Sequence, residues 1–335
     1  MRAFTYASPR TVAGAIALLT PSPHENGESA RALAGGTDLL TLMKSDLLAP
    51  DQLVDIKRLA DLDDRIADGP TGLTIGALTT LAELEADPLI LARYAALSEA
   101  AALAATPQLR NMATIGGNLL QRPRCWYFRD SRVPCWLKGG DDCPARRGEN
   151  QLHALFDVSP CVAVHPSDPA TALMALDAVV RLRGAAGERE LPLTEFFAPP
   201  TADRRRETIL ADDELVTSVR IPPLAADARS TYLKAMERKV WAFALVSVAA
   251  VIRVQEVRIT HARVVLGGVA PIPWRAEPAE RVLMGAEPTA ETFAHAAEAA
   301  LKGAQPLANN AYKIPLATAL VRRALTQLTE PTSGN

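Results

Sequence analysis

The sequence predicts a protein of the α+β class that is divided into more than one domain. The chain has 335 residues, of which 48% are hydrophobic, so it can bury a substantial core and exceeds the size of one typical domain. Its first two thirds alternate short strand-like and helix-like segments. Its last third places strand-like segments first and helical segments after them, a succession typical of an α+β domain.

The first segments predict a strand at residues 4–6, a helix at 12–19 and then a strand–turn–helix unit around Gly35-Gly36-Thr37-Asp38. Adjacent glycines let the backbone approach a phosphate and direct N–H groups at it. The turn therefore predicts half of an anion site, and the alternative is that Thr37 or Asp38 only caps a helix. The Gly-x-Gly-x-x-Gly fingerprint is missing from this turn, which disfavours a Rossmann nicotinamide site.

The next segments predict a second domain with its own glycine turn. Residues 53–56 and 73–77 are typical of buried strands, and residues 79–84 and 91–105 of helices. Thr106-Pro107 ends the second helix, and the turn Thr114-Ile115-Gly116-Gly117-Asn118 follows. Two such turns can converge on one diphosphate, so together they strengthen the prediction of a phosphate site.

All four cysteines lie in one loop, at about residues 122–161, which is rich in charged and turn residues. A loop of this length inside a compact domain needs something to hold it. Nine, seven and seventeen residues separate Cys125, Cys135, Cys143 and Cys161. Structural zinc sites use close Cys-x-x-Cys pairs, whereas wide spacings favour a 4Fe-4S cluster. Zinc, or four unrelated buried thiols, are the alternatives.

The remaining segments predict strands first and helices last. Residues 162–164 predict a buried strand, and His165 just after it is expected to be structural. Further strands, including a hairpin at 180–191, and then helices are expected at residues 214–222, 230–236, 242–254, 257–266, 289–302 and 315–328. The domains are predicted at residues 1–57, 58–224 and 225–330.

Composition excludes several classes of partner. The net charge of −2 gives no general attraction to nucleic acid or to acidic membranes, and the basic run at residues 204–206 is expected to be solvated. No apolar run reaches the length of about 18–20 residues that membrane insertion needs. Residues 1–6 do not resemble a signal peptide, so the expected location is cytoplasmic, with periplasmic export alongside a signal-bearing partner as the alternative.

Five motifs resemble, in order and spacing, those of the FAD-binding medium subunit of the xanthine dehydrogenase family of molybdenum hydroxylases. They are the two glycine turns and residues 166–170, 213–215 and 266–271. The cysteine loop is similar to that of the flavin subunits of periplasmic aldehyde oxidoreductase and 4-hydroxybenzoyl-CoA reductase, which bind a 4Fe-4S cluster. The resemblance implies a vanillyl-alcohol-oxidase-like FAD-binding region of two α+β subdomains, followed by a C-terminal α+β domain.

The resemblance also implies site residues. The four cysteines would bind the cluster, and the glycine-turn amides would hold the FAD diphosphate. Asp168 would accept from ribityl or ribose hydroxyls, Leu215 would line the ring, and Lys234, unless it is an exposed strand lysine, would place positive charge near the flavin. Trp241 departs from the family pattern and puts aromatic bulk beside the flavin region. The implied FAD contacts are Leu33, Ala34, Gly35, Gly36, Thr37, Asp38, Leu39, Leu40, Ala104, Thr106, Thr114, Ile115, Gly116, Gly117, Asn118, Asp168, Leu215 and Lys234.

The function that the resemblance implies is electron transfer, with no catalytic side chain in this chain. A large partner subunit would oxidise substrate at a molybdenum cofactor, in an enzyme of the aldehyde oxidoreductase or xanthine dehydrogenase type. A small partner with 2Fe-2S clusters would pass electrons to the FAD, which would serve an external electron acceptor. The alternatives are a self-sufficient flavin oxidase and a zinc-stabilised binding module without redox function. Because the flavin turns lie elsewhere in the sequence, we expect replacement of Cys135 by serine to leave FAD bound.

Overall fold

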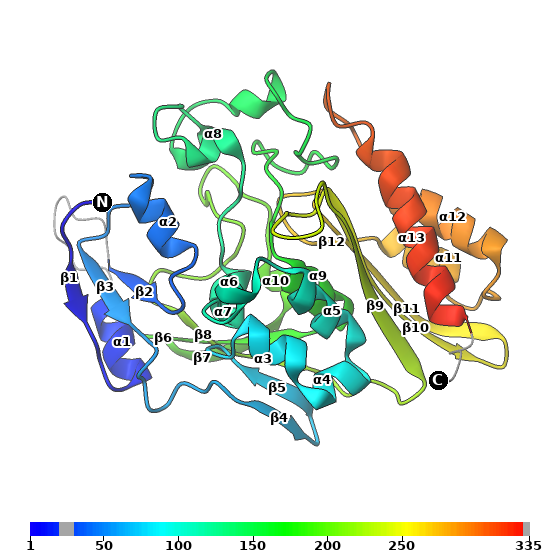
Figure 1. The fold of residues 1–335 in the computed structure, drawn as a ribbon, viewed down its shortest axis with the longest axis horizontal. Coiled ribbons are helices and arrows are strands. Elements are labelled where there is room, and N and C mark those ends of the chain that lie inside the picture. Colours follow the sequence, from blue (N-terminus) through cyan, green and yellow to red (C-terminus); the bar gives the residue numbers. More distant parts are fainter. Residues whose placement is uncertain (20–29, 331–335) are drawn as a thin grey trace.

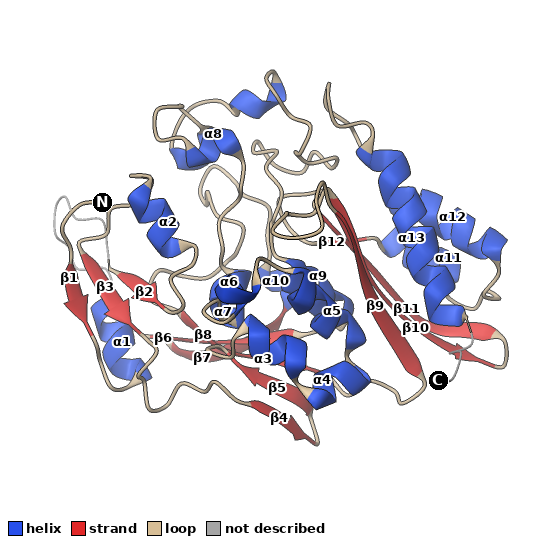
Figure 2. Cartoon of the chain, viewed as in Figure 1, coloured by secondary structure: helices blue, strands red, loops and turns tan. Residues whose placement is uncertain are grey.

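The computed structural model describes residues 1–19 and 30–330, whose strands form three sheets that follow one another across the molecule (Figure 1). Helices lie between and around the sheets (Figure 2). The elements are β1 Thr5–Ala7, α1 Val12–Leu19, β2 Arg31–Leu33, α2 Leu39–Lys44, β3 Gln52–Asp55, β4 Ile66–Gly69, β5 Gly72–Gly76, α3 Leu81–Ala86, α4 Pro88–Arg93, α5 Ala95–Leu103, α6 Pro107–Arg110, α7 Ile115–Leu119, α8 Trp126–Arg129, η1 Trp136–Lys138, η2 Pro144–Arg146, α9 Asp168–Ala175, β6 Val179–Gly184, β7 Gly187–Pro192, α10 Leu193–Phe196, β8 Leu215–Ile221, β9 Ala228–Ala235, β10 Val246–Gln255, β11 Arg258–Gly267, β12 Trp274–Arg275, α11 Glu277–Leu283, α12 Ala290–Ala300 and α13 Lys313–Thr329. The mixed content of helix and sheet confirms the α+β class.

The first sheet is parallel, with the strand order β1-β3-β2. Helix α1 packs on it through apolar residues spaced at i, i+3, i+4 and i+7, which form one face of a helix. These buried residues are Val12, Ala15, Ile16 and Leu19. Strand β2 ends at Leu33, directly before the first glycine turn, and α2 begins directly after the turn. The sheet therefore fixes where the turn lies.

The second sheet is antiparallel, with the order β4-β5-β8-β6-β7, and includes the predicted hairpin as β6 and β7. Helices α3, α5 and α9 pack together beside it, and α7, which carries the second glycine turn, contacts both α9 and β8. One continuous apolar cluster joins the first sheet, the second sheet and these helices. The second turn is thus attached to a rigid core.

The third sheet has the order β12-β11-β10-β9 and is buried on both faces. Along β10, Ala249 and Val251 belong to the core shared with α5 and α9, while Val248 and Ala250 face the core beneath α11, α12 and α13. A strand buried on both faces needs apolar residues at every position, which explains why β10 appears in the sequence as a continuous apolar run.

Two predicted elements differ from the structure, and one helix was missed. The helix expected at residues 91–105 is two helices, α4 and α5, because Tyr94 between them leaves helical geometry with φ −131° and ψ 48°. The strand expected at 162–164 is buried but irregular. The segment forms isolated backbone hydrogen bonds and not a ladder: Ala154 N donates to Val162 O at 2.8 Å, and His165 N donates to Ala270 O at 3.0 Å. Helix α11 was not predicted.

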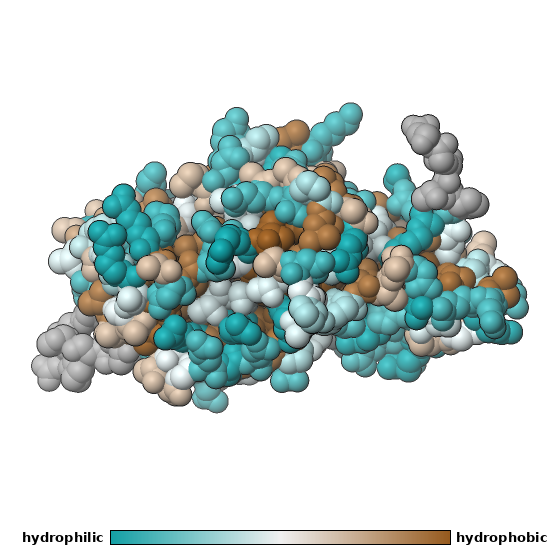
Figure 3. Space-filling model, turned by 90° about the horizontal axis from the view of Figure 1, so that it is seen from below, coloured by the Kyte–Doolittle hydropathy of each residue, from teal (hydrophilic) through white to brown (hydrophobic). Residues whose placement is uncertain are grey.

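The cysteine loop connects α7 to α9 and contains only the short helical turns α8, η1 and η2. In Figure 1 it lies above the central helices, between α2 and the third sheet. No helix among the described residues is both long and apolar enough to cross a membrane. The face shown in Figure 3 is hydrophilic at its margins, with apolar residues gathered nearer its middle.

Candidate functional site

The two glycine turns lie directly against each other. A Cβ atom built on Gly35 would lie 1.7 Å from the carbonyl oxygen of Met112, so no other residue fits there without a shift of the backbone. One residue, Ala113, separates Met112 from the second turn. Gly36 has φ +72°, a conformation that favours glycine. The close approach that only glycine permits therefore brings the two turns together in space.

The turns differ in which backbone N–H groups remain available. In the second turn, Gly116 N donates to Ala77 O at 3.0 Å and Gly117 N donates to the Thr114 hydroxyl at 3.3 Å. In the first turn, no acceptor in the described part of the chain pairs with the N–H groups of residues 35–37. The first turn can therefore donate to an anion, while the second shapes the opposite wall.

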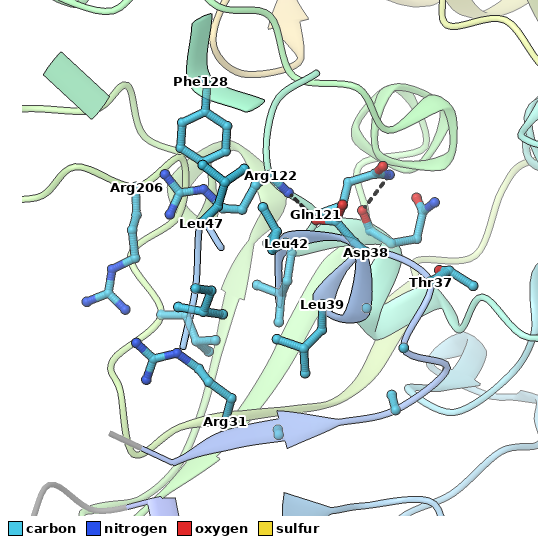
Figure 4. A pocket seen from close by; sticks show the side chains of 18 of the residues that line it. Arg31, Thr37, Asp38, Leu39, Leu42, Leu47, Gln121, Arg122, Phe128 and Arg206 are labelled. Carbon is cyan, nitrogen blue, oxygen red and sulfur yellow. Dashed lines mark hydrogen bonds between the residues drawn. The ribbon is translucent and has the colours of Figure 1, made fainter. Parts of the chain in front are cut away.

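Two adjoining cavities open at the turns. The first, of about 890 Å³, is lined by both turns and by Leu215 on β8. Figure 4 shows Arg31 and Arg206 on its wall, from β2 and from the loop before β8. The second, of about 660 Å³, is lined by Ala104, Asp168 and Trp241. Five residues line both cavities, which makes them neighbouring parts of one cleft: Thr37, Ala113, Asn118, Gln121 and Arg124. Both volumes are in the range of small-molecule and cofactor sites.

Asp168 and Lys234 form a buried pair with each other. Lys234 Nζ lies 2.8 Å from Asp168 Oδ2, also donates to Leu103 O at 2.9 Å, and has a side chain that is only 1% exposed. The Tyr232 hydroxyl donates to Asp168 Oδ1. Burial raises the pKa of Asp168, and the charge and hydrogen bond of Lys234 oppose that rise. The alternative of an exposed strand lysine is wrong. Lys234 contacts Asp168, which lines the second cavity, while Lys234 itself lines neither cavity.

Asp38, predicted among the FAD contacts, uses its carboxylate to hold the cysteine loop. It accepts from the backbone N of Arg122 at 2.8 Å and pairs with the guanidinium groups of Arg129 at 2.8 Å and Arg124 at 3.0 Å. Figure 4 shows the contact with Arg122. The signal in the sequence was the group of arginines at the start of the loop, whose partner 84 or more residues earlier could not be identified from the pattern.

The predicted FAD contacts, including those described above, divide into two groups. Residues whose side chains or backbone line a cavity are Ala34, Gly35, Gly36, Thr37, Asp38, Leu39, Ala104, Thr114, Gly116, Gly117, Asn118, Asp168 and Leu215. Those that line neither cavity support the turns or helices nearby and are Leu33, Leu40, Thr106, Ile115 and Lys234. Leu33 and Leu40, for example, pack around Gly36, and the Thr106 hydroxyl caps α6.

The basic run at residues 204–206 was expected to be solvated, and this is wrong for Arg205 but not for Arg206, whose side chain is 42% exposed. Arg205 donates to the carbonyl oxygens of Trp136 and Gly140 and stacks 4.9 Å from the centre of the Trp136 ring. Arg206 lines the first cavity. The run therefore serves the site, a role that charge patterning alone could not distinguish from a solvated loop.

The four cysteines come together in one buried cluster. Cys135 and Cys161 are buried with Phe128 and Trp136, and Cys125 and Cys143 pack against this group. The electrostatic interactions of Cys125 reach Cys135 and Cys143, and Cys143 is hydrogen-bonded to Cys161. Cysteines up to 36 positions apart in the sequence therefore lie in one region of the folded loop.

The surroundings of the sulfurs shift the pKa values of the four thiols in different directions. Burial raises the pKa of Cys125 to about 11, while the backbone amides of Phe128 and Tyr127 favour its thiolate. The hydrogen bond to Cys161 lowers the pKa of Cys143 to about 6, and the same bond with burial raises that of Cys161. Backbone amides also favour the thiolates of the other three, with Ala163 N donating to Cys161 Sγ at 3.4 Å. Among the described residues, no three His, Cys, Asp or Glu side chains are placed to hold a single metal ion.

The cysteine loop is also part of the cleft. Cys135 and Lys138 line the first cavity, and Cys125, Trp126 and His153 line the second. The sequence placed the flavin turns and the cysteines far apart, which led us to expect separable sites. The structure brings both to the wall of the same cleft, so a change at Cys135 is a change in the wall of the first cavity.

Comparison with known proteins gives matches along the whole chain. Residues 2–224 match the family described as the FAD binding domain in molybdopterin dehydrogenase, and residues 231–328 match the CO dehydrogenase flavoprotein C-terminal domain. The chain is 39% identical over 331 residues to the aldehyde oxidoreductase FAD-binding subunit PaoB of Escherichia coli (strain K12), with 98% of each chain covered. It is 31% identical over 327 residues to the carbon monoxide dehydrogenase medium chain of Hydrogenophaga pseudoflava, with 96% of each chain covered. A solved structure of carbon monoxide dehydrogenase from the same organism superposes with a TM-score of 0.77 at 30% identity, over 98% of this chain and 97% of that one.

Proposed function

Because this chain belongs to the family of FAD-binding subunits of molybdopterin dehydrogenases, we propose that it is the FAD- and 4Fe-4S-containing electron-transfer subunit of a heteromeric molybdenum hydroxylase. The relative PaoB is named as the FAD-binding subunit of an aldehyde oxidoreductase, which favours that type of holoenzyme. In this proposal a large partner carries the molybdenum cofactor and a small partner carries 2Fe-2S clusters. Bound FAD supplies the conversion between the one-electron steps of iron–sulfur clusters and the two-electron reduction of an acceptor.

The observation that carries the flavin assignment is the cleft between the converging glycine turns. The available N–H groups of residues 35–37 would donate to the diphosphate. Asn118 lines both cavities, and its side-chain oxygen accepts from the Ser167 hydroxyl, which ties the second turn to the start of α9. Leu215 would pack against one ring system in the first cavity. Asp168, held in place by Lys234 and Tyr232, would accept from hydroxyl groups in the second.

The cluster assignment rests on the convergence of the four cysteines. A 4Fe-4S cluster is held by four thiolates, and hydrogen bonds to the sulfurs and exclusion of water both set its properties. Cys125, Cys135, Cys143 and Cys161 meet in an apolar pocket, where backbone amides favour their thiolates. Binding of the cluster would replace the protons of the buried thiols with iron and would order the loop.

Anaerobic purification of the full chain tests the cofactors. We expect flavin absorbance together with a broad iron–sulfur shoulder, and about four iron and four sulfide per chain. Colourless protein with stoichiometric zinc would contradict the proposal and favour a zinc-stabilised binding module.

Reconstitution tests the role as a subunit. Co-expression with the large and small partners should give aldehyde-dependent reduction of an acceptor dye, and the chain alone should give none. Full turnover by the chain alone would instead identify a self-sufficient flavin oxidase.

A further inference from the structure

His153 lies at the contact between the cysteine cluster and the cleft. Its Nε2 atom is 3.2 Å from Cys125 Sγ, a distance that fits a hydrogen bond to sulfur. The residue is only 2% exposed, and its ring meets the Trp126 ring edge to face, with 5.1 Å between ring centres. His153 is not one of the predicted ligands and has no role in the flavin assignment above. Its position requires a separate explanation.

The available partners determine which ring nitrogen carries the proton. Nδ1 is buried and has no hydrogen-bond partner in the described part of the chain. A neutral imidazole has one donor and one acceptor nitrogen, and a metal-bound thiolate can only accept. A buried N–H group without a hydrogen-bond partner costs more free energy than a buried lone pair without one, and buried donors rarely go unpaired. When Cys125 is a metal-bound thiolate, the proton therefore resides on Nε2, directed at the sulfur.

The backbone of His153 is held by the C-terminal domain. Its carbonyl oxygen accepts from Lys313 Nζ at 2.9 Å and from Asn310 Nδ2 at 3.1 Å. Lys313 also donates to Gly268 O, at the end of β11, and is fully buried. These contacts tie the part of the loop that carries the ring to the C-terminal domain.

The same residues lie on the side of the cysteine cluster that meets the second cavity. Cys125, Trp126 and His153 line that cavity together with Asp168, whereas Cys135 lines the first. A charge or dipole at Cys125 thus acts on the wall of the second cavity.

We propose that His153 donates a hydrogen bond from Nε2 to the cluster-bound thiolate of Cys125 and thereby raises the reduction potential of the cluster; this inference rests on the proposed function. Reduction adds one electron and one negative charge to the cluster. An N–H donor stabilises the more negative state better, because charge-assisted hydrogen bonds strengthen with charge on the acceptor. His153 keeps its proton throughout, and no bond is formed or broken. His153 is therefore a positioning residue for electron transfer and not a ligand.

The test is a redox titration of the full chain, monitored by the electron paramagnetic resonance signal of the reduced cluster. His153→Phe keeps an aromatic ring against Trp126 and removes the donor, whereas His153→Gln keeps an N–H group near the position of Nε2. We expect the Phe variant to retain iron and sulfide and to shift the midpoint potential to a more negative value. We expect the Gln variant to have a potential close to that of the wild type.

His165→Phe is the matched control. His165 is also buried and lines the second cavity, but its ring packs on Phe197 and its Nδ1 accepts from Ser167 N, so the potential should not change.

Three results would overturn the inference. An unchanged potential in His153→Phe would show that the donor has no effect. Loss of iron from both His153 variants would identify His153 as a ligand. An equal shift in His165→Phe would point to a general change in the cavity. Wild-type protein without iron and sulfide would instead refute the cluster assignment itself, and so is distinguishable from a failure at His153.

Discussion

The glycine turns and the cysteine loop line the same cleft but are positioned in different ways. The turns are fixed by backbone packing, in which Gly35 lies so close to Met112 that a Cβ atom has no room. The loop has almost no regular structure and is held by long cationic side chains. Arg129 of the loop pairs with Asp38. Arg205, before β8, and Lys313, on α13, donate to backbone carbonyl oxygens of the loop. Backbone packing leaves a local signal in the sequence, whereas side-chain anchors join distant residues and leave none.

Replacing Gly35 by alanine should have the largest effect. The new Cβ would overlap Met112 O, so the turns must separate, and we expect a loss of at least about 4 kcal/mol in the free energy of unfolding together with loss of bound flavin. Thermal unfolding and flavin content measure both. Gly69→Ala is the control, because its nearest neighbour would be 3.9 Å away. Equal effects at the two positions would show that close packing of the turns is not what matters.

Replacing Asp38 by asparagine should release the loop while leaving the turns in place. The substitution leaves the guanidinium groups of Arg124 and Arg129 without their partly buried partner, which costs about 3 kcal/mol. Limited proteolysis should then cut within residues 122–161 before it cuts elsewhere. Asp212→Asn removes an exposed partner of Arg206 and should not change the cleavage pattern. Unchanged cleavage in Asp38→Asn would contradict the role of Asp38 as an anchor.

Because of Lys313, the free energy of unfolding should rise with pH. Burial lowers its pKa from 10.5 to about 7, so between these values the unfolded state binds more protons than the folded state. Stability from this group therefore increases from pH 7 upward, by about 2 kcal/mol between pH 7 and 9. Denaturant titrations at several pH values should show this slope in the wild type and its loss in Lys313→Met. Lys302→Met changes an exposed lysine and should keep the slope. A slope that survives in Lys313→Met would assign it to another group.

Replacing Arg205 by lysine should have the smallest effect. Lysine keeps the charge but loses the planar stack on Trp136 and one of the two carbonyl contacts, at a cost of about 1 kcal/mol. Denaturant unfolding monitored by tryptophan fluorescence reports both stability and the environment of Trp136. A larger loss than in Asp38→Asn would reverse the order of the anchors.

The sequence predicted those parts that depend on local chemistry. Glycines at 35, 36, 116 and 117 indicated the two segments that meet in the cleft, whereas the 4Fe-4S cluster expected from the spacing of the cysteines stays a prediction. It did not reveal that Asp168 and Lys234 pair in the interior, because one lies at a helix start and the other 66 residues later on β9. The arginines of the loop and of residues 204–206 were equally ambiguous, since charged residues on a surface and charged residues across a cleft have the same local pattern.

The most direct test of the account is a crystal structure of anaerobically purified protein with anomalous data collected at the iron edge. We expect flavin density in the cleft, with its diphosphate against residues 35–37, and iron anomalous density among Cys125, Cys135, Cys143 and Cys161. Flavin bound away from the glycine turns, or a single zinc ion among the four sulfurs, would contradict it.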